Sequence, residues 1–122
     1  MENIPSVIDL TQSAADIEHA FAQESCLLVH FSSPACSVCH STLPQLIQVA
    51  QDHHVPVVDI SIDTHPEVAA QRLVFTVPTI LVLAQGKEML RESRFIGFDR
   101  IDRLLGLMAE DSSPRPIEKR SL

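Results

Sequence analysis

Two cysteines three positions apart, Cys36 and Cys39, are the residues whose type and spacing most directly indicate chemistry. Such a pair can close a disulfide across one helical turn, and the thiolate form of a cysteine attacks other disulfides. A short apolar run, Cys26 to Phe31, and a Ser-Ser-Pro-Ala turn lead into the pair, which should open a helix. The free N–H groups at a helix N-terminus favour an anion, so Cys36 should ionise readily. The sequence therefore predicts a redox-active dithiol, with Cys36 as the nucleophile and Cys39 as the resolving thiol.

Hydrophobic periodicity predicts the elements that must position these cysteines. Short β-branched and apolar runs predict strands, and apolar residues at spacings of three and four predict helices. We expect strands at residues 6–10, 26–32, 57–62, 79–84 and 89–95, and helices at residues 14–23, 36–52, 66–73 and 98–109. The polar run at residues 91–94 marks the last strand as an edge. This order predicts an α/β fold, with a mixed four- or five-stranded sheet between about four helices.

Composition and charge narrow the class of protein. The chain has 122 residues, 45% of them apolar and 20% charged, as expected for one globular domain. Its formal net charge of −7 argues against a nucleic-acid partner. The first ten residues carry neither a basic segment nor a continuous apolar one, so no secretory signal is predicted. The longest apolar runs are too short to span a bilayer, and we expect a cytoplasmic protein that does not act at a membrane.

Further segments of the chain resemble the thioredoxin family. They lie in the family's order and at its separations, and they cover roughly residues 6–109. They are the helix-kinking Pro44, the central strand 57–63, the cis-proline loop Val77-Pro78-Thr79, the hairpin Gln85-Gly86-Lys87, and Gly97 before the last helix. The resemblance implies a thioredoxin-like domain over residues 1–110. The tail, residues 111–122, contains two prolines and no periodicity, which predicts disorder.

The resemblance also implies an activity. It indicates a thiol–disulfide oxidoreductase without a cofactor, acting reductively on disulfide-containing proteins, with a reductase as electron donor and a monomer as the expected state. If the bond before Pro78 is cis, as in the family, the backbone of Val77 would lie beside the sulfurs and pair with a substrate strand. The small Ala35 would leave room for the substrate disulfide, and Gly97 would complete the substrate-binding surface.

His30 and Asp59 depart from the family pattern in a specific way. Thioredoxins carry a buried aspartate at the position of His30, which is thought to take the proton of the resolving cysteine, and its lysine partner stands at the position of Asp59. In this chain the basic residue, His30, stands at the family's acidic position, and the acidic residue, Asp59, stands at its basic position. The two positions thus still hold a titratable pair. One hypothesis is that His30 deprotonates Cys39 while Asp59 orients the imidazole and raises its basicity. The other hypothesis is that His30 is a buried core residue that hydrogen-bonds to Asp59 and does no chemistry.

The motif itself also departs from the family. The usual Trp-Cys-Gly-Pro-Cys-Lys is replaced by the sequence of residues 35–40, Ala-Cys-Ser-Val-Cys-His. Loss of the tryptophan and the inner proline keeps open an alternative function, a redox-dependent binding module with little general reductase activity. The same residues match the Cys-x-x-Cys-His haem signature, but covalent haem requires export and an open cleft. A metal site is not expected either, because no second cysteine pair follows. Cys26 is interpreted as a small buried hydrophobe.

Overall fold

The computed structural model describes residues 13–112 and places four helices and four strands there, which alternate along the chain except that β4 follows β3 directly. The elements are α1 (Ala14–Ala22), β1 (Leu27–Ser32), α2 (Cys39–His53), β2 (Val57–Ser61), α3 (Pro66–Gln71), β3 (Thr79–Ala84), β4 (Lys87–Ser93) and α4 (Phe98–Ser112). The predicted strand at residues 6–10 and residues 113–122 of the predicted tail lie outside the described residues, whereas residues 111 and 112 belong to α4. The division into a domain and a tail therefore stays a prediction.

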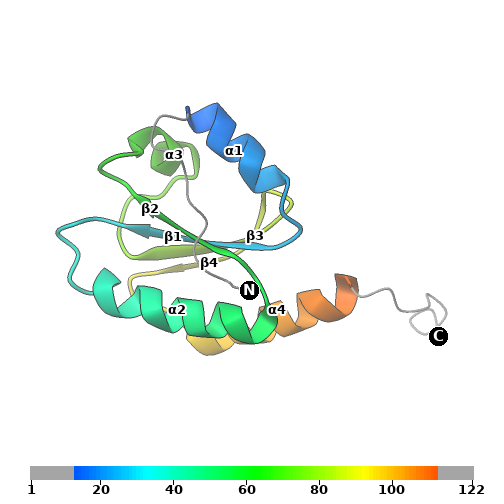
Figure 1. Cartoon of the computed structure of the whole chain (residues 1–122). Helices are drawn as coiled ribbons and strands as arrows, with labels where there is room; N and C mark the ends of the chain where they lie inside the picture. The colour runs from blue at the N-terminus through cyan, green and yellow to red at the C-terminus, as the bar shows by residue number, and fades with distance from the viewer. Residues whose placement is uncertain (1–12, 113–122) are drawn as a thin grey trace.

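The four strands form one mixed sheet in the order β2-β1-β3-β4. β1 and β2 run parallel, whereas β3 is antiparallel to both β1 and β4. Helices α1 and α3 cover one face of the sheet, and α2 and α4 cover the other (Figure 1). The predicted mixed sheet between helices is confirmed, and β4 is the edge strand that its polar residues indicated.

Alternate residues of the central strand β1 divide between two cores, because successive side chains of a strand point to opposite faces. Leu27, Val29 and Phe31 pack with Ile17 and Phe21 of α1 in the core on the α1–α3 face. On the other face, Leu28 packs in a second core with α2 and α4. His30 follows Leu28 on this second face, so the strand delivers a histidine to the helix that begins with Cys39.

Two predicted helix boundaries were wrong by three residues, and the helix predicted at residues 66–73 ends two residues earlier, at Gln71. The active-site helix begins at Cys39 and not at Cys36, because the amide of His40 bonds the carbonyl of Ser37, three residues back, in a turn. Regular bonding four residues back starts only with the amide of Thr42 and the carbonyl of Val38. The last helix continues to Ser112, beyond its predicted end at residue 109. Within residues 13–112, no helix is both long and apolar enough to cross a membrane.

Candidate active site

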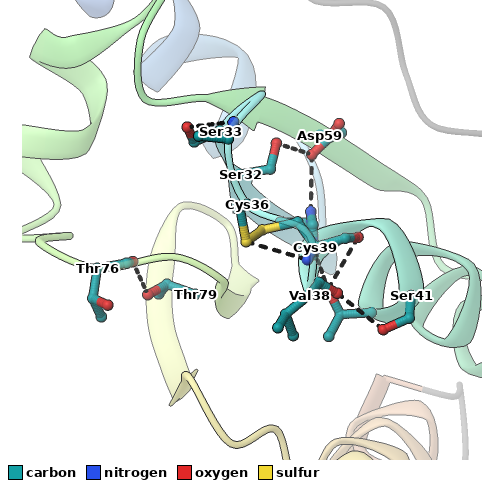
Figure 2. The surroundings of a disulfide bond; sticks show 12 residues. Ser32, Ser33, Cys36, Val38, Cys39, Ser41, Asp59, Thr76 and Thr79 are labelled. Carbon is teal, nitrogen blue, oxygen red and sulfur yellow. Dashed lines mark hydrogen bonds and ion pairs between the residues drawn. A yellow bond between two sulfur atoms is a disulfide. The ribbon is translucent and has the colours of Figure 1, made fainter.

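Cys36 and Cys39 form a disulfide at the N-terminal end of α2 (Figure 2). Their Cα atoms are 5.4 Å apart, within the ordinary range for a disulfide. The preceding turn is held by the Cys36 amide, which donates to the carbonyl of Ser33 at 3.0 Å. The amide of Ala35 donates to the Ser33 hydroxyl at 3.3 Å. The predicted strand-to-helix placement of the pair is confirmed, with a turn inserted between the two elements.

The two sulfur-bearing residues differ in exposure. Cys36 is partly exposed and its neighbour Ala35 is exposed, whereas Cys39 is only 4% exposed. The backbone N–H of Cys39 donates to Sγ of Cys36 at 3.2 Å (Figure 2). This donor, together with the dipole of the 15-residue helix, would stabilise a thiolate on Cys36 after reduction. Cys36 is therefore accessible from the surface, whereas Cys39 is covered.

His30 and Asp59 meet directly beneath the helix, as the sequence predicted. The parallel pairing of β1 with β2 places the two residues in register. Nδ1 of the fully buried His30 lies 2.9 Å from Oδ1 of Asp59. The same carboxylate oxygen accepts the Ser32 hydroxyl at 3.0 Å (Figure 2). A partly buried carboxylate thus fixes the orientation of a buried imidazole.

Thr42 is a contact of His30 that the sequence reasoning missed. Its Oγ1 lies 2.8 Å from Nε2 of His30 and 3.3 Å from the carbonyl oxygen of Cys39. Thr42 follows Cys39 by three residues, so both lie on the buried stripe of α2, and that spacing was the available signal. His30 and Cys39 also line one cavity of about 350 Å³, together with Asp59 and Ser61. Within residues 13–112, neither ring nitrogen of His30 hydrogen-bonds to the Cys39 sulfur.

The Val77–Pro78 bond is cis, as the resemblance implied. Thr79 pairs with Phe31, so the cis bond lies at the end of the sheet where β1 leads into the Cys36 turn. The Thr79 hydroxyl donates to the carbonyl of Thr76 at 2.7 Å and holds this loop (Figure 2). Among the described residues, neither backbone polar group of Val77 bonds to another part of the chain. Val77 thus offers an N–H and a C=O at the site.

Gly97 lies in the segment that returns from β4, and Glu92 fixes it there. The buried Glu92 carboxylate accepts the Gly97 amide at 2.9 Å and both Nε and Nη2 of Arg100, at 2.9 and 2.8 Å. A methyl group at Gly97 would come within 2.5 Å of Nη2 of Arg100, so glycine permits the guanidinium to stay on Glu92. The Arg94 amide also donates to the Pro78 carbonyl at 2.8 Å, which ties this segment to the cis-proline loop.

Replacing Glu92 with glutamine should lower stability at neutral pH but not in acid. Hydrogen bonds from Arg100 lower the pKa of Glu92 below its ordinary value of 4.5. The ionised carboxylate therefore stabilises the fold above that value, and this contribution is lost as the pH falls through the lowered pKa. We expect a loss of about 1 kcal/mol in the free energy of unfolding at neutral pH, measured by urea denaturation.

Glu88→Gln is the matched control for this substitution. Glu88 and Arg91 form a more exposed pair, so we expect a smaller loss at neutral pH. A loss in Glu92→Gln that persists unchanged in acid would contradict the assignment, because the protonated carboxyl no longer differs in charge from the amide.

Two exposed aromatic residues near the cis-proline loop were also missed. Phe75 and Phe95 are 82% and 84% exposed. Phe75 lies two residues before Val77, and Phe95 lies two residues after Ser93, the partner of Thr79 in the sheet. The guanidinium of Arg94 lies 5.9 Å from the centre of the Phe95 ring. Both residues therefore lie in segments next to the sheet end that carries the disulfide, and most of their surface is exposed.

The third cysteine is separate from this site. Cys26 lies one residue before β1, in a second cavity formed with His53 and Met89 among others. Burial raises the pKa of its thiol to about 11, so it stays protonated and unreactive at neutral pH. Among the described residues, no three histidine, cysteine or acidic side chains come together as a metal site would require.

Comparison with known proteins agrees with this geometry. The family model described as thioredoxin matches residues 7–110. Thioredoxin-like protein YdfQ of Bacillus subtilis is 38% identical over 94 residues, covering 76% of this chain and 84% of that protein. Thioredoxin 1 of Nostoc is 25% identical over 95 residues, covering 76% and 78%. The structure of thioredoxin 1 from Thermosipho africanus superposes with a TM-score of 0.65 at 29% identity, covering 70% of this chain and 97% of that one. The chain therefore belongs to the thioredoxin family, and its disulfide-forming cysteine pair is that of a thiol–disulfide oxidoreductase.

Proposed function

We propose that this protein reduces disulfide bonds in other proteins through Cys36 and Cys39. The observation that carries the proposal is the unequal exposure of the two cysteines, one reachable and one buried, at a helix N-terminus. A structural disulfide has no need of this asymmetry, whereas an exchange reaction needs an accessible nucleophile and a protected resolving thiol.

The reaction would proceed in two exchange steps. The Cys36 thiolate attacks one sulfur of the substrate disulfide, forms a mixed disulfide and releases the other substrate sulfur as a thiolate. The Cys39 thiol then loses its proton and attacks Cys36 Sγ, which closes the internal disulfide and releases the second substrate thiolate. Two electrons pass from the protein dithiol to the substrate. A dithiol donor or a reductase then reduces the internal disulfide again.

His30 is proposed as the acceptor of the Cys39 proton. It is the buried imidazole that shares a cavity with Cys39, and a neutral imidazole is a competent base near neutral pH. The cavity is large enough to hold water beside the Cys39 sulfur, from which a proton could reach Nε2 through the Thr42 hydroxyl that bonds it. Asp59 supports this role, because its carboxylate would stabilise the imidazolium once the proton has arrived.

Val77, Pro78, Ala35 and Gly97 are proposed to bind the substrate. The free backbone groups of Val77 can pair with an extended segment of the substrate, as in the addition of a strand to a sheet. The cis bond and the tie between Arg94 and Pro78 keep these groups in place. Main-chain pairing alone gives little sequence selectivity, which fits a reductase with many protein substrates.

One observation favours the alternative, a binding module that docks a dedicated partner. Phe75 and Phe95 expose two aromatic rings beside the cis-proline loop, and exposed aromatic residues are enriched where proteins bind one another. Their contact area would add selectivity that backbone pairing lacks. A redox-dependent partner would then bind at the same groove while turnover stayed slow.

Reduction of insulin by dithiothreitol tests the main proposal. We expect the wild-type protein, at micromolar concentration, to accelerate this reaction well above the rate with dithiothreitol alone, because Cys36 is an accessible thiol with a stabilised thiolate. A rate equal to that of dithiothreitol alone would contradict a general reductase and favour the binding module. We also propose a reductase as the physiological electron donor, a monomeric state and a cytoplasmic location, where thiols are kept reduced.

A further inference from the structure

The buried hydroxyl of Thr42 contacts Nε2 of His30 and the backbone carbonyl of Cys39, so it touches both residues of the proposed proton transfer. Thr42 is buried on the first turn of α2, and Oγ1 is 2.8 Å from Nε2 of His30. On its other side, Oγ1 is 3.3 Å from the carbonyl oxygen of Cys39. A threonine hydroxyl has one hydrogen to donate and two lone pairs to accept with. The hydroxyl can therefore donate to the Cys39 carbonyl while it accepts from a protonated Nε2, or it can donate to a bare Nε2.

Asp59 determines which ring nitrogen of His30 can take up a proton. A carboxylate only accepts hydrogen bonds, so Nδ1 of His30 carries the hydrogen of the bond to Asp59. The Ser32 hydroxyl donates to the same oxygen, which leaves that arrangement unchanged. Nε2 is consequently the atom at which a neutral His30 gains a proton. Thr42 is the hydrogen-bond partner of that atom.

The contacts of Thr42 can be satisfied in both protonation states of His30. With neutral His30, the Thr42 hydroxyl donates to Nε2. With protonated His30, Nε2–H donates to Oγ1, and the hydroxyl hydrogen turns to the carbonyl of Cys39. The change needs only a rotation about the C–O bond, so no heavy atom has to move. Neither state leaves a buried donor unpaired, which would be costly.

We propose that Thr42 is a positioning residue that sets the proton affinity of His30 during resolution of the mixed disulfide. When the Cys39 thiol loses its proton, His30 gains one at Nε2, and Thr42 stabilises the imidazolium by accepting that new N–H. The Cys39 thiolate then attacks Cys36 Sγ and displaces the substrate thiolate. This inference rests on the proposed function of His30. The other titratable groups around the cavity are Asp59 from β2 and His40 and Cys39 from α2.

The test separates the two exchange steps with an aromatic disulfide, 5,5′-dithiobis(2-nitrobenzoate), added to the reduced protein. Attack by Cys36 releases the first coloured thiolate, and resolution by Cys39 releases the second. We expect Thr42→Val, which removes the hydroxyl at nearly constant volume, to slow only the second release, by roughly fivefold to tenfold near neutral pH. Thr42→Ser keeps the hydroxyl and should restore the wild-type rate.

The pH profile of the second release provides a readout that a packing defect would not move. His30 must be neutral to accept a proton, so this release should rise with pH in the wild type. In Thr42→Val the protonated imidazole loses its acceptor at Nε2, and bonds to a charged group are the stronger ones, so the rise should shift to lower pH. An unshifted profile, or Thr42→Ser as slow as Thr42→Val, would overturn the inference. Absence of the first release in the wild type would instead overturn the proposed function.

A measurement on the wild-type protein covers the case in which Thr42→Val does not fold. Nitrogen-15 shifts of the His30 ring in the oxidised protein distinguish the two neutral tautomers. The inference requires the hydrogen on Nδ1 and a bare Nε2 that accepts from Thr42. A neutral ring with its hydrogen on Nε2 would overturn it without any reference to activity.

Discussion

Replacing Cys36 with serine should abolish insulin reduction, and replacing Cys39 with serine should leave the protein covalently attached to its substrates. In Cys36→Ser the remaining thiol of the pair, Cys39, is buried and cannot meet a substrate disulfide. In Cys39→Ser the exposed nucleophile still attacks, but no second thiol resolves the mixed disulfide. We expect turnover to fall by at least about a thousandfold in both variants, as is typical when a covalent nucleophile or its partner is lost.

The mixed disulfides of Cys39→Ser also separate the two candidate functions. Non-reducing electrophoresis of the variant exposed to a mixture of cellular proteins, followed by mass spectrometry, counts the partners. Many partners would support a general reductase, and a single one would support the binding module that Phe75 and Phe95 favour. Cys26→Ser is the matched control, because its protonated and partly buried thiol should contribute no adduct. Covalent adducts formed by Cys36→Ser would contradict the assignment of Cys36 as the nucleophile.

Replacing His30 with asparagine should slow resolution of the mixed disulfide by about a hundredfold, the usual effect of removing a general base. Asparagine can keep a donor close to Asp59 but cannot accept the Cys39 proton. The two-release assay with the aromatic disulfide measures this directly, since the first release depends on Cys36 and should be unchanged. Asp59→Asn should have a smaller effect in the same direction, because the imidazolium would lose its counter-charge.

A second histidine–aspartate pair in the chain supplies the control for this experiment. His53 Nε2 lies 2.7 Å from Oδ1 of Asp102, at the opposite end of α2 from the cysteines. His53→Asn removes a similar contact far from the site, so both releases should keep their wild-type rates. An equal slowing in His53→Asn and His30→Asn would indicate a general loss of helix packing. A normal second release in His30→Asn would reduce His30 to a core residue held by Asp59.

Local features of the sequence were sufficient for the sheet, the helices and the cysteine pair. The apolar runs and their periods depend on nearest neighbours along the chain, so they predicted β1, β2, β3 and β4 to within a few residues at each end. The position of Cys36 and Cys39 between a strand and a helix followed in the same way. The start of α2 could not be predicted in this way, because a turn through Ser37 and Val38 replaces the first residues of the predicted helix.

The contacts of the proposed proton acceptor depended on the tertiary structure. His30, Thr42 and Asp59 come from β1, α2 and β2, and their contacts exist because the parallel register and the packing of α2 bring three separate elements together around the imidazole. In the sequence, the only sign of the His30–Asp59 pair was that the acidic and basic positions of the family are exchanged. The sequence contained Thr42 only as one polar residue on a helix stripe.

The surface proposed to face the substrate was also predicted only in part from the sequence. By itself, the sequence determined the redox chemistry and the α/β architecture, because both depend on residue types at short spacing. The tertiary structure alone decided that Glu92 and Arg100 hold Gly97, that Arg94 reaches Pro78, and that Phe75 and Phe95 remain exposed. The physical reason is that hydrogen bonds and burial between distant segments depend on strand pairing and helix packing, which leave no local pattern in the chain.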